Sequence, residues 1–593
     1  MSGTPKLNIF FLLFPCLFFA QSNISDFTSI RKDDMTYEMK IPNTHKFQII
    51  IEEGDLRDDS TPIPEKFDFT AYVPIGGSSE NGYLSINSER DPGDVSILDI
   101  NFNTTTKLWS YTAAANLDFS AVSGTQYNCS GTVTPWNTVI TCEERTAPDG
   151  PDADSRKDIG WCIEIDPVTK TVGTSDNPQK LWALGNMRHE NVVIDPSTYA
   201  NNRVIYFGED INNGYIYKLV ADTPKDFTNG YNPTTMNGGK LFVYRGPKNG
   251  AGQWVQLNNF TDIDQNTTRT QSDSAGGATF NGGVEDVEIN PIDNNIYFAV
   301  KGLGESCIYK IVDPDPLSGS SIPVMSKYAG GASKQYEVLP GVFEAWGDGV
   351  DNLAFDDLGN LWSMQDDLSN TEGFIWVIEN GHVDGSNEKA KIFGQVPIGA
   401  EPTGITFSPD YRFMFMSIMH PNTSNNGTQK DAAGTTLANN KDAAIVISRI
   451  EELGTTYVYD NGWVSGTPAG TSPTYSDIVI KNGDAEITQT MTCYKVIVKP
   501  GASLKVNSGI TLTVEDELTL ESSSNSYSSL LGDGAIIGTI KYERFVNAQT
   551  NRNDLIAPPL DGQTWSDFLT TDSDKNNPNE RNIFNNGAGT PTY

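Results

Sequence analysis

The feature that most constrains the fold is a short segment that recurs four times along the middle of the chain. In each copy an acidic residue precedes an apolar run, and a polar turn ends the run. The copies begin at His189-Glu190, Val284-Glu285-Asp286, Asp351-Asn352 and Glu401, and they end at Asp195-Pro196, Asn290-Pro291, Asp356-Asp357 and Ser408-Pro409. A second alternating run follows every copy, and a third follows three of them. Such radial repetition of short strands is typical of β-propellers.

Two further segments extend the repeat toward the N-terminus. Residues 139–144, continued by 161–167, predict a fifth blade, and residues 83–89 predict the start of a sixth. Helical periodicity is scarce, whereas short alternating runs of Val, Ile, Tyr, Phe and Trp are bounded by Gly, Asn, Asp and Pro. We therefore expect an all-β chain, consisting of a six-bladed β-propeller followed by a small β-solenoid-like or β-sandwich module.

The composition along the chain divides it into four parts. Residues 1–20 have the pattern of a secretory signal peptide, with Lys6, an apolar run over 7–19 and Ala20 at the cleavage point. The propeller then spans 21–465, the β-module spans 475–545, and 546–593 form an irregular or truncated C-terminal segment. We expect a secreted or cell-surface protein, extracellular or periplasmic. No later stretch has the roughly 18 consecutive apolar residues that a membrane span needs.

The charge balance narrows the choice of partners. With 41 basic and 76 acidic residues the formal net charge is -35, which disfavours nucleic acid because its phosphates would be repelled. Metal cations suit such a chain better, and we expect a monomer. Five cysteines remain after the signal peptide, an odd number, so at least one thiol is unpaired.

The repeat also aims carboxylates at one place. Glu190, Glu285 and Asp351 each stand five residues before the polar turn, and Glu401 stands seven before it. Odd spacings preserve the side of the strand, so all four face the same way. In a propeller the innermost strand faces the central channel, where such acids need cations such as Ca²⁺, Mg²⁺ or Mn²⁺. The alternative is that each acid only caps the start of its strand.

The most distinctive segment is 128–144, Asn-Cys-Ser-Gly-Thr-Val-Thr-Pro-Trp-Asn-Thr-Val-Ile-Thr-Cys-Glu-Glu. It resembles the signature of the PhoX-type alkaline phosphatases, which are six-bladed propellers that use Ca²⁺ and Fe³⁺ to hydrolyse phosphomonoesters. The resemblance extends in order through most of residues 80–425. It includes Leu184-Gly-Asn-Met-Arg-His-Glu190, Gly208-Glu-Asp210, Asp351-Asn-Leu-Ala-Phe355 and Met419-His-Pro421.

The resemblance implies a set of site residues. Cys142 would be a thiolate ligand to iron, with Glu190 and Glu285 in the same cluster. The further metal candidates are Glu143, Glu144, Asp351 and Glu401. The alternative for Cys142 is a buried thiol or a disulfide with Cys129 or Cys162. The catalytic candidates His189 and His420 bind metal or substrate phosphate, or else make a structural hydrogen bond.

The sequence departs from the family pattern in two places. Where the family has an Arg before Pro-Glu, this chain has Gly283-Val284-Glu285, so the expected phosphate-binding Arg is missing. Arg145, which follows the Cys-Glu-Glu run, either replaces it as a catalytic residue or pairs with the acids. The signal peptide also lacks the twin arginine that is common in the family.

The resulting hypothesis is a secreted, metal-dependent phosphomonoesterase with a Ca²⁺/Fe³⁺ cluster in the propeller channel, acting on small phosphomonoesters. Two alternatives remain open. One is a calcium-dependent propeller lactonase or phosphotriesterase, whose channel needs acids but no cysteine. The other is a non-enzymatic surface binding propeller, which the missing Arg and the appended β-module would suit.

Overall fold

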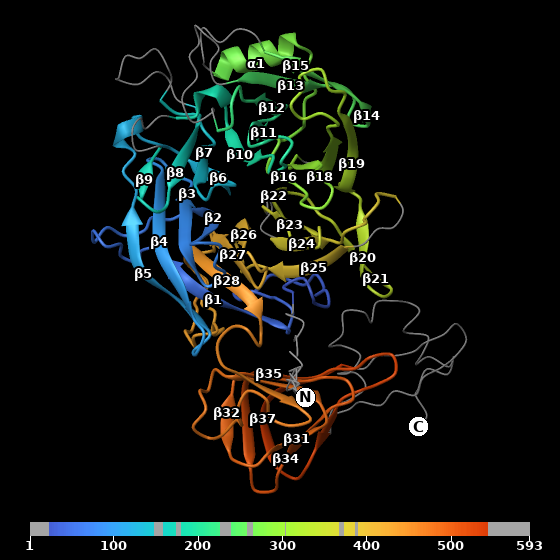
Figure 1. The fold of residues 1–593 in the computed structure, drawn as a ribbon. Helices are drawn as coiled ribbons and strands as arrows, with labels where there is room; N and C mark the ends of the chain where they lie inside the picture. Colours follow the sequence, from blue (N-terminus) through green and yellow to red (C-terminus); the bar gives the residue numbers. More distant parts are fainter. Residues whose placement is uncertain are drawn as a thin grey trace, which may run out of the picture.

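Six β-sheets surround a central axis, and a further set of parallel strands lies beside them in the computed structural model (Figure 1). The structure describes residues 23–146, 158–173, 180–225, 239–257, 265–302, 304–366, 373–385 and 390–543. The predicted all-β class and six-bladed propeller are confirmed, and the appended module is a β-solenoid. The expected signal peptide and the segment 546–593 lie outside the described residues.

The first three blades follow the chain outward from the axis. Blade 1 contains β2 (Phe67–Pro74), β3 (Asn81–Ser88), β4 (Asp94–Asn103) and β5 (Leu108–Asn116). Blade 2 contains β6 (Asn128–Val133), β7 (Val139–Glu143), β8 (Cys162–Asp166) and β9 (Thr171–Val172). Blade 3 contains β10 (His189–Ile194), β11 (Val204–Glu209), β12 (Ile216–Val220), β13 (Lys240–Arg245) and β15 (Gln253–Gln256). The first strand of each blade is innermost (Figure 1).

The last three blades repeat this order. Blade 4 contains β16 (Val287–Ile289), β17 (Ile296–Val300), β18 (Cys307–Val312), β19 (Val324–Gly330) and β14 (Gly250–Ala251). Blade 5 contains β22 (Val350–Phe355), β23 (Leu361–Gln365), β24 (Phe374–Ile378) and β25 (Ala390–Gln395). Blade 6 contains β26 (Glu401–Phe407), β27 (Phe413–Met419), β28 (Ala443–Arg449) and β1 (His45–Glu52). The hairpin of β20 (Gln335–Leu339) and β21 (Val342–Ala345), and helix α1 (Gln265–Ser274), are insertions.

The N-terminal strand closes the ring. β1 pairs antiparallel with β28, so the outermost strand of the last blade comes from the start of the chain. Beside it, Tyr72 of blade 1 stacks on Phe415 of blade 6 with ring centroids 4.7 Å apart. Packing of apolar faces between neighbouring blades forms the core, because each sheet is too thin to bury its own side chains.

A β-bulge opens the inner strand of nearly every blade. The register with the second strand shifts between Phe67 and Thr70, Asn128 and Gly131, His189 and Val192, Val350 and Leu353, and Thr403 and Ile405. Blade 4 has the same irregularity, since Ala299 receives a bond from the Glu285 N–H and donates one to the Asp286 carbonyl. A bulge leaves unpaired residues and re-aims their side chains. Here it turns one side chain per blade toward the axis.

The solenoid begins earlier than the expected boundary. Its main sheet contains β29 (Thr456–Asp460), β30 (Asp477–Asn482), β33 (Lys495–Val498), β35 (Thr511–Leu520), β32 (Met491–Cys493) and β37 (Ala535–Tyr542). A second sheet contains β31 (Asp484–Ile487), β34 (Ser503–Val506) and β36 (Ser529–Leu531), and every pair of strands in both sheets is parallel. β29 therefore adds residues 456–460 to the module that was expected from 475.

The solenoid packs against blade 6 through a mixed interface. Ile450 of the propeller forms a small apolar cluster with Val479 and Ile497. Lys46 on the closing strand β1 forms an ion pair with Asp477 at 2.7 Å. Within the described residues, no helix is both long and apolar enough to cross a bilayer.

Candidate metal centre

The bulges of the inner strands place one side chain from each blade around one end of the axis. We call these six residues the inner ring: Asp68, Cys129, Glu190, Glu285, Asp351 and Thr403. Five of the six can bind a metal, and they belong to blades 1 to 5. In blade 6 the bulge lies later in the strand, after Thr403, which pairs with Ser417 and whose hydroxyl donates to Asp68 Oδ1 at 2.6 Å.

A second set of residues follows the second strand of each blade. We call it the outer ring: Glu89, Glu144, Asp210, Lys301, Asp366 and His420, each directly after β3, β7, β11, β17, β23 and β27. The same end of the second strand lies beside the start of the inner strand in an antiparallel blade. Both rings therefore lie at one mouth of the channel.

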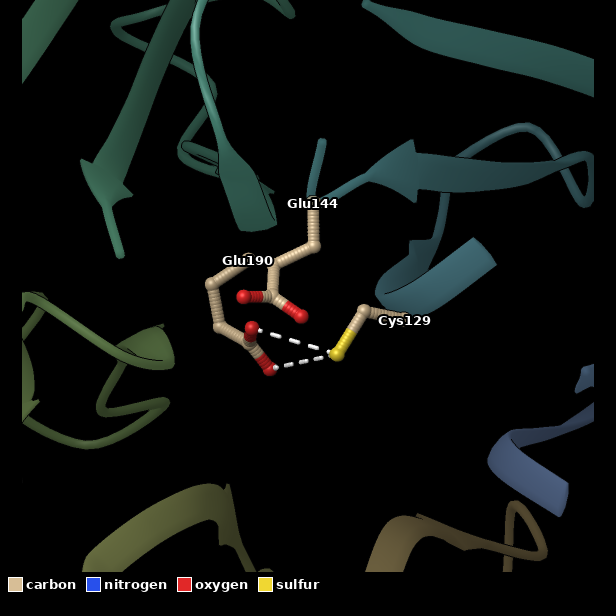
Figure 2. A group of neighbouring side chains, drawn as sticks. All are labelled: Cys129, Glu144 and Glu190. Atoms are coloured by element: carbon tan, nitrogen blue, oxygen red, sulfur yellow. Dashed lines mark hydrogen bonds between the residues drawn. The ribbon is translucent and has the colours of Figure 1, made fainter. Parts of the chain in front are cut away.

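The Cys129 thiol contacts carboxylates of two neighbouring blades. Its Sγ lies 3.0 Å from Asp68 Oδ2 and 3.2 Å from Glu190 Oε2. Figure 2 shows Cys129 of β6, Glu144 after the end of β7 and Glu190 of β10 pointing toward one another, and their ligand atoms lie within 4.8 Å of one another. A thiolate with carboxylates suits a transition metal such as iron better than an alkaline-earth ion.

A second group shares Glu190. One ligand atom each from Glu190, Asp210 and Glu285 also lies within 4.8 Å of the others. Glu285 Oε1 is buried and has no hydrogen-bond partner among the described residues. An unpartnered buried carboxylate oxygen is costly, and a cation beside it removes the cost. The two groups form one continuous site across blades 2, 3 and 4.

The pKa directions show that these buried acids favour the neutral form unless a cation lies beside them. Burial, then the charge of neighbouring carboxylates, raises the pKa of Glu190 well above its ordinary value, and burial likewise dominates at Glu144 and Glu285. Burial raises the pKa of Asp68 to about 7. The pKa of the Cys129 thiol is also well above its ordinary value, with burial the largest cause. Either protons or metal ions must neutralise this cluster at neutral pH, and the mixed thiol and carboxylate donors fit a metal.

The other half of the rings contains a lysine. Lys301 Nζ lies 2.8 Å from Asp351 Oδ2 and 2.5 Å from Asp366 Oδ2. Asp366 also shares a hydrogen bond with Glu401, which raises the pKa of Glu401 further above the value that burial gives it. Blades 4, 5 and 6 therefore meet around an ammonium group, whereas blades 2, 3 and 4 meet around the two candidate metal groups.

A sequence model of the family described as alkaline phosphatase PhoX matches residues 109–316 and 324–422, which is more than half of the chain. The chain belongs to the PhoX alkaline phosphatase family. The match begins in blade 1 and ends in blade 6, so it includes most of both rings. Among curated proteins, none matches this PhoX-family chain significantly.

One similar solved structure supports the propeller fold. PhoX of Pseudomonas fluorescens in complex with vanadate, a transition state analogue, has a TM-score of 0.55 at 19% identity, covering 72% of this chain and 98% of that chain. A periplasmic gluconolactonase of Pseudomonas aeruginosa has a TM-score of 0.30 at 8% identity, covering 64% and 91%. A gluconolactonase from Xanthomonas campestris has a TM-score of 0.26 at 9% identity, covering 68% and 100%. Only the first is similar enough to support the fold.

The structure separates the two cysteines of the PhoX-like signature. Cys142 on β7 lies directly opposite Cys162 on β8, with the two sulfur atoms 3.5 Å apart. It is fully buried in the apolar core shared by blades 2 and 3, and it belongs to neither candidate metal group. The prediction singled out Cys142, but the geometry favours Cys129, because β6 and not β7 is the innermost strand of blade 2.

The two glutamates after Cys142 also differ. Glu143 is fully buried, and it accepts bonds from Lys180 Nζ at 2.7 Å and from the backbone N–H groups of Gly160 and Trp161. Its oxygens are occupied, so it stabilises the loop after β7. Glu144 instead reaches the channel mouth. Of the predicted metal ligands, the structure therefore brings together Glu144, Glu190 and Glu285, and it places Asp351 and Glu401 in the half that contains Lys301.

The predicted catalytic residues lie in three different settings. His189 is fully buried, its Nε2 lies 2.8 Å from the Gly185 carbonyl, and burial lowers its pKa to about 4. His420 is exposed at the mouth of the channel, and its backbone N–H donates to Asp442. Arg145 packs over the Tyr127 ring at 4.9 Å, and its charge opposes the rise in the pKa of Glu144 that burial causes. His420 and Arg145 are thus near the rings, whereas His189 contacts the blade interior.

The missing Arg has a structural reason. Gly283 has φ +109, and a Cβ atom there would lie 1.9 Å from Asp210 Oδ1. No Arg side chain fits at this position without moving a member of the outer ring. The nearest cation to Glu285 in the rings is instead Lys301 on the following strand.

Sequence reasoning did not name Asp68, Asp210, Lys301 and Asp366, and it considered Cys129 only as a disulfide partner of Cys142. Three of these, Asp210, Lys301 and Asp366, follow a rule that the sequence does contain. A charged residue or His comes directly after the second strand of every blade. Asp68 and β2 were missed because only the second strand of blade 1 was recognised, from 83–89.

Proposed function

We propose that this chain is an exported phosphomonoesterase whose channel mouth holds iron and calcium. Cys129, Glu144 and Glu190 would hold iron, and Glu190, Asp210 and Glu285 would extend the centre toward calcium. The observation that carries the proposal is the convergence of a thiol and carboxylates from three blades, with Glu285 Oε1 buried and unpartnered. Membership of the PhoX family supports the phosphatase activity.

When bound, such ions neutralise the phosphate oxygens of a substrate and lower the pKa of a bound water. The chain's own residues prepare the site for them. The bulges fix the inner-ring side chains, and the hydroxyl of Thr403 orients Asp68. Asp68 in turn accepts the contact from Cys129. The acids therefore need little rearrangement to bind cations, which is the condition for effective electrostatic catalysis.

Two basic side chains, Arg145 and His420, border the centre and can contact an anionic substrate. Arg145 is half-buried beside Glu144, with its guanidinium over Tyr127. The His420 side chain is exposed at its edge of the mouth. Partial desolvation, followed by the positive charge of Lys66, lowers the pKa of its imidazole. A depressed pKa leaves His420 neutral near pH 7, so it can accept or pass a proton at the channel mouth. Arg145 is the residue we assign to hold the substrate phosphate.

The test compares two cysteines in the full chain. We would express it through its export route and measure iron and calcium by elemental analysis, together with hydrolysis of p-nitrophenyl phosphate. The unmodified chain should contain both metals and lose activity in chelator. Cys129→Ser should lose iron and at least about 100-fold of the activity, since removal of a metal ligand costs that much or more.

Cys142→Ser is the matched control, because it removes a buried thiol that lies opposite Cys162 in the apolar core and belongs to neither candidate metal group. It should keep its iron and activity. Loss of iron from Cys142→Ser but not from Cys129→Ser would reverse the assignment. A well-folded chain with calcium but neither iron nor phosphatase activity would contradict the proposed function.

A further inference from the structure

The outer ring contains one lysine among its acidic residues. In blades 1, 2, 3 and 5 the position after the second strand is an acid, and in blade 4 it is Lys301. Its ammonium group reaches two carboxylates, Asp351 at 2.8 Å and Asp366 at 2.5 Å. A lysine in a ring of acids is expected to do more than fill a surface position.

The surroundings of Lys301 are those of a cation site. Asp351, Glu285, Asp366 and Glu401 all stabilise its charged form, and together they outweigh the desolvation that opposes it. The Lys301 and Asp351 side chains are only 20% and 14% exposed. Carboxylate oxygens from three blades surround this one positive charge, as carboxylates would surround a divalent ion in the other half of the rings.

The backbone keeps this lysine in place. Gly302, the next residue, packs so closely that a Cβ atom there would lie 1.9 Å from the Asn281 carbonyl oxygen. The chain at 301 is therefore held against the loop that precedes Glu285. Close packing at Gly302 therefore fixes the backbone of Lys301, and its ion-pair partners Asp351 and Asp366 both belong to blade 5.

We infer that Lys301 is a resident cation that takes the place of one metal ion in the blade 5 and 6 half of the rings. The inference rests on the proposed metal centre, and it defines which blades contribute ligands to that centre. Asp351 and Asp366 pair with the ammonium, Glu401 shares a hydrogen bond with Asp366, and none of the three binds metal. The metal ligands are limited to blades 1 to 4.

The consequence concerns the number of ions. A single ammonium charge replaces a divalent ion, so this half attracts an anionic substrate less than a metal would, but it stays neutralised when metal is scarce. The site on the Cys129 side then binds its ions without competition from a second acidic cluster. Lys301 thereby limits the metal content and places the ions on one side of the channel.

The experiment counts metal ions in the full chain. Lys301→Met, Lys301→Arg, Lys310→Met and the unmodified chain would be equilibrated with excess Ca²⁺, passed through a desalting column and analysed for calcium and iron per chain. Lys310 is the matched control, because it pairs with Asp293 on the same blade but away from the rings. Lys301→Met should gain one calcium ion per chain, whereas Lys301→Arg and Lys310→Met should match the unmodified chain.

A second variant keeps the test decisive if Lys301→Met does not fold. Asp366→Asn removes a partner of the ammonium, so it should leave the metal count unchanged. Loss of one ion from Asp366→Asn, or an unchanged count in folded Lys301→Met, would overturn the inference. Because these readouts are metal counts, absence of phosphatase activity in the unmodified chain would contradict the proposed function without deciding the role of Lys301.

Discussion

The propeller and the solenoid are built from the same kind of short strand, yet they bury different groups where their strands meet. At the channel mouth the propeller buries acids whose pKa values are raised, such as Glu190 and Glu285. The solenoid core is aliphatic, with Ile478, Leu504 and Leu512 fully buried. Its charged side chains pair nearer the surface, as Lys499 does with Glu521.

This difference shows which part of the molecule depends on ligands. A fully apolar core gains stability from burial alone, so the solenoid needs no cofactor to fold. A cluster of buried acids opposes folding unless protons or cations neutralise it. Proteins retain such a cluster where it performs a function. The comparison therefore assigns the chemistry to the propeller and a supporting role to the solenoid.

Removal of metal should give the largest contrast between the two regions. Each ion present at a thousandfold excess over its dissociation constant stabilises the folded state by about 4 kcal/mol. With chelator, hydrogen exchange measured by mass spectrometry should accelerate in β6, β10 and β16 and stay unchanged in β33 and β35. Equal acceleration in the solenoid strands would show that the two regions do not differ in their need for metal.

The pH dependence of the chelated protein sharpens this prediction. Burial raises the pKa of Asp351 to about 6 and that of Asp68 to about 7. A raised folded-state pKa of an acid gives stability that is complete below the unfolded value, about 4, and is lost as pH rises through the folded value. The chelated propeller should therefore unfold at a lower temperature at pH 8 than at pH 5. The metal-loaded protein should not weaken in this way, and a scan of both forms by calorimetry checks it.

A cavity in the solenoid core should lower the stability of the solenoid without changing the metal site, which is the opposite of metal removal. Leu504→Ala removes a fully buried side chain from the solenoid core and should cost about 2–5 kcal/mol. Denaturant unfolding followed by the solenoid's exchange protection should show this loss. Hydrolysis of p-nitrophenyl phosphate and the metal content should stay as in the unmodified chain. A fall in either would mean that the solenoid contributes to the site.

The sequence predicted the parts of the fold that repeat. The copies around Glu190, Glu285, Asp351 and Glu401 all form inner strands of blades, and the polar residues that end them cap turns, as Asp195 does through the Ser197 N–H. What it could not show was long-range pairing. β1 joins β28 across almost the whole propeller, and no local pattern encodes such a partner.

The site was predicted in part for a similar reason. Glu144, Glu190 and Glu285 follow from spacing and resemblance, and the structure brings them together. Cys129 was weighed only as a disulfide partner, because alternation alone cannot show that β6 is innermost while β7 is second. Lys301 and Asp366 lie far apart in sequence, and only the arrangement of blades 4 and 5 makes their ion pair visible.

The border between the two regions offers a smaller test of the same comparison. Lys46 on β1 and Asp477 on β30 form an ion pair with only 13% and 4% of their side chains exposed. Lys46→Met leaves Asp477 without its cation and should lower the free energy of unfolding by about 1–3 kcal/mol. Urea unfolding checks this, and Lys46→Arg is the matched control that keeps the charge. An unchanged midpoint in Lys46→Met would show that the closing strand does not depend on the solenoid.

The smallest effect is expected at the exposed edge of that border. Lys481 of β30 pairs with Glu451 at 2.9 Å, but the lysine side chain is 42% exposed. Solvent screens such a pair, so Lys481→Ala should change the free energy of unfolding by less than about 1 kcal/mol, and less still in high salt. If urea unfolding at two salt concentrations shows a larger loss that shrinks in high salt, exposed charges hold the solenoid to the propeller. The buried contact of Lys46 with Asp477 would then no longer explain the attachment, and the supporting role of the solenoid would vary with ionic strength.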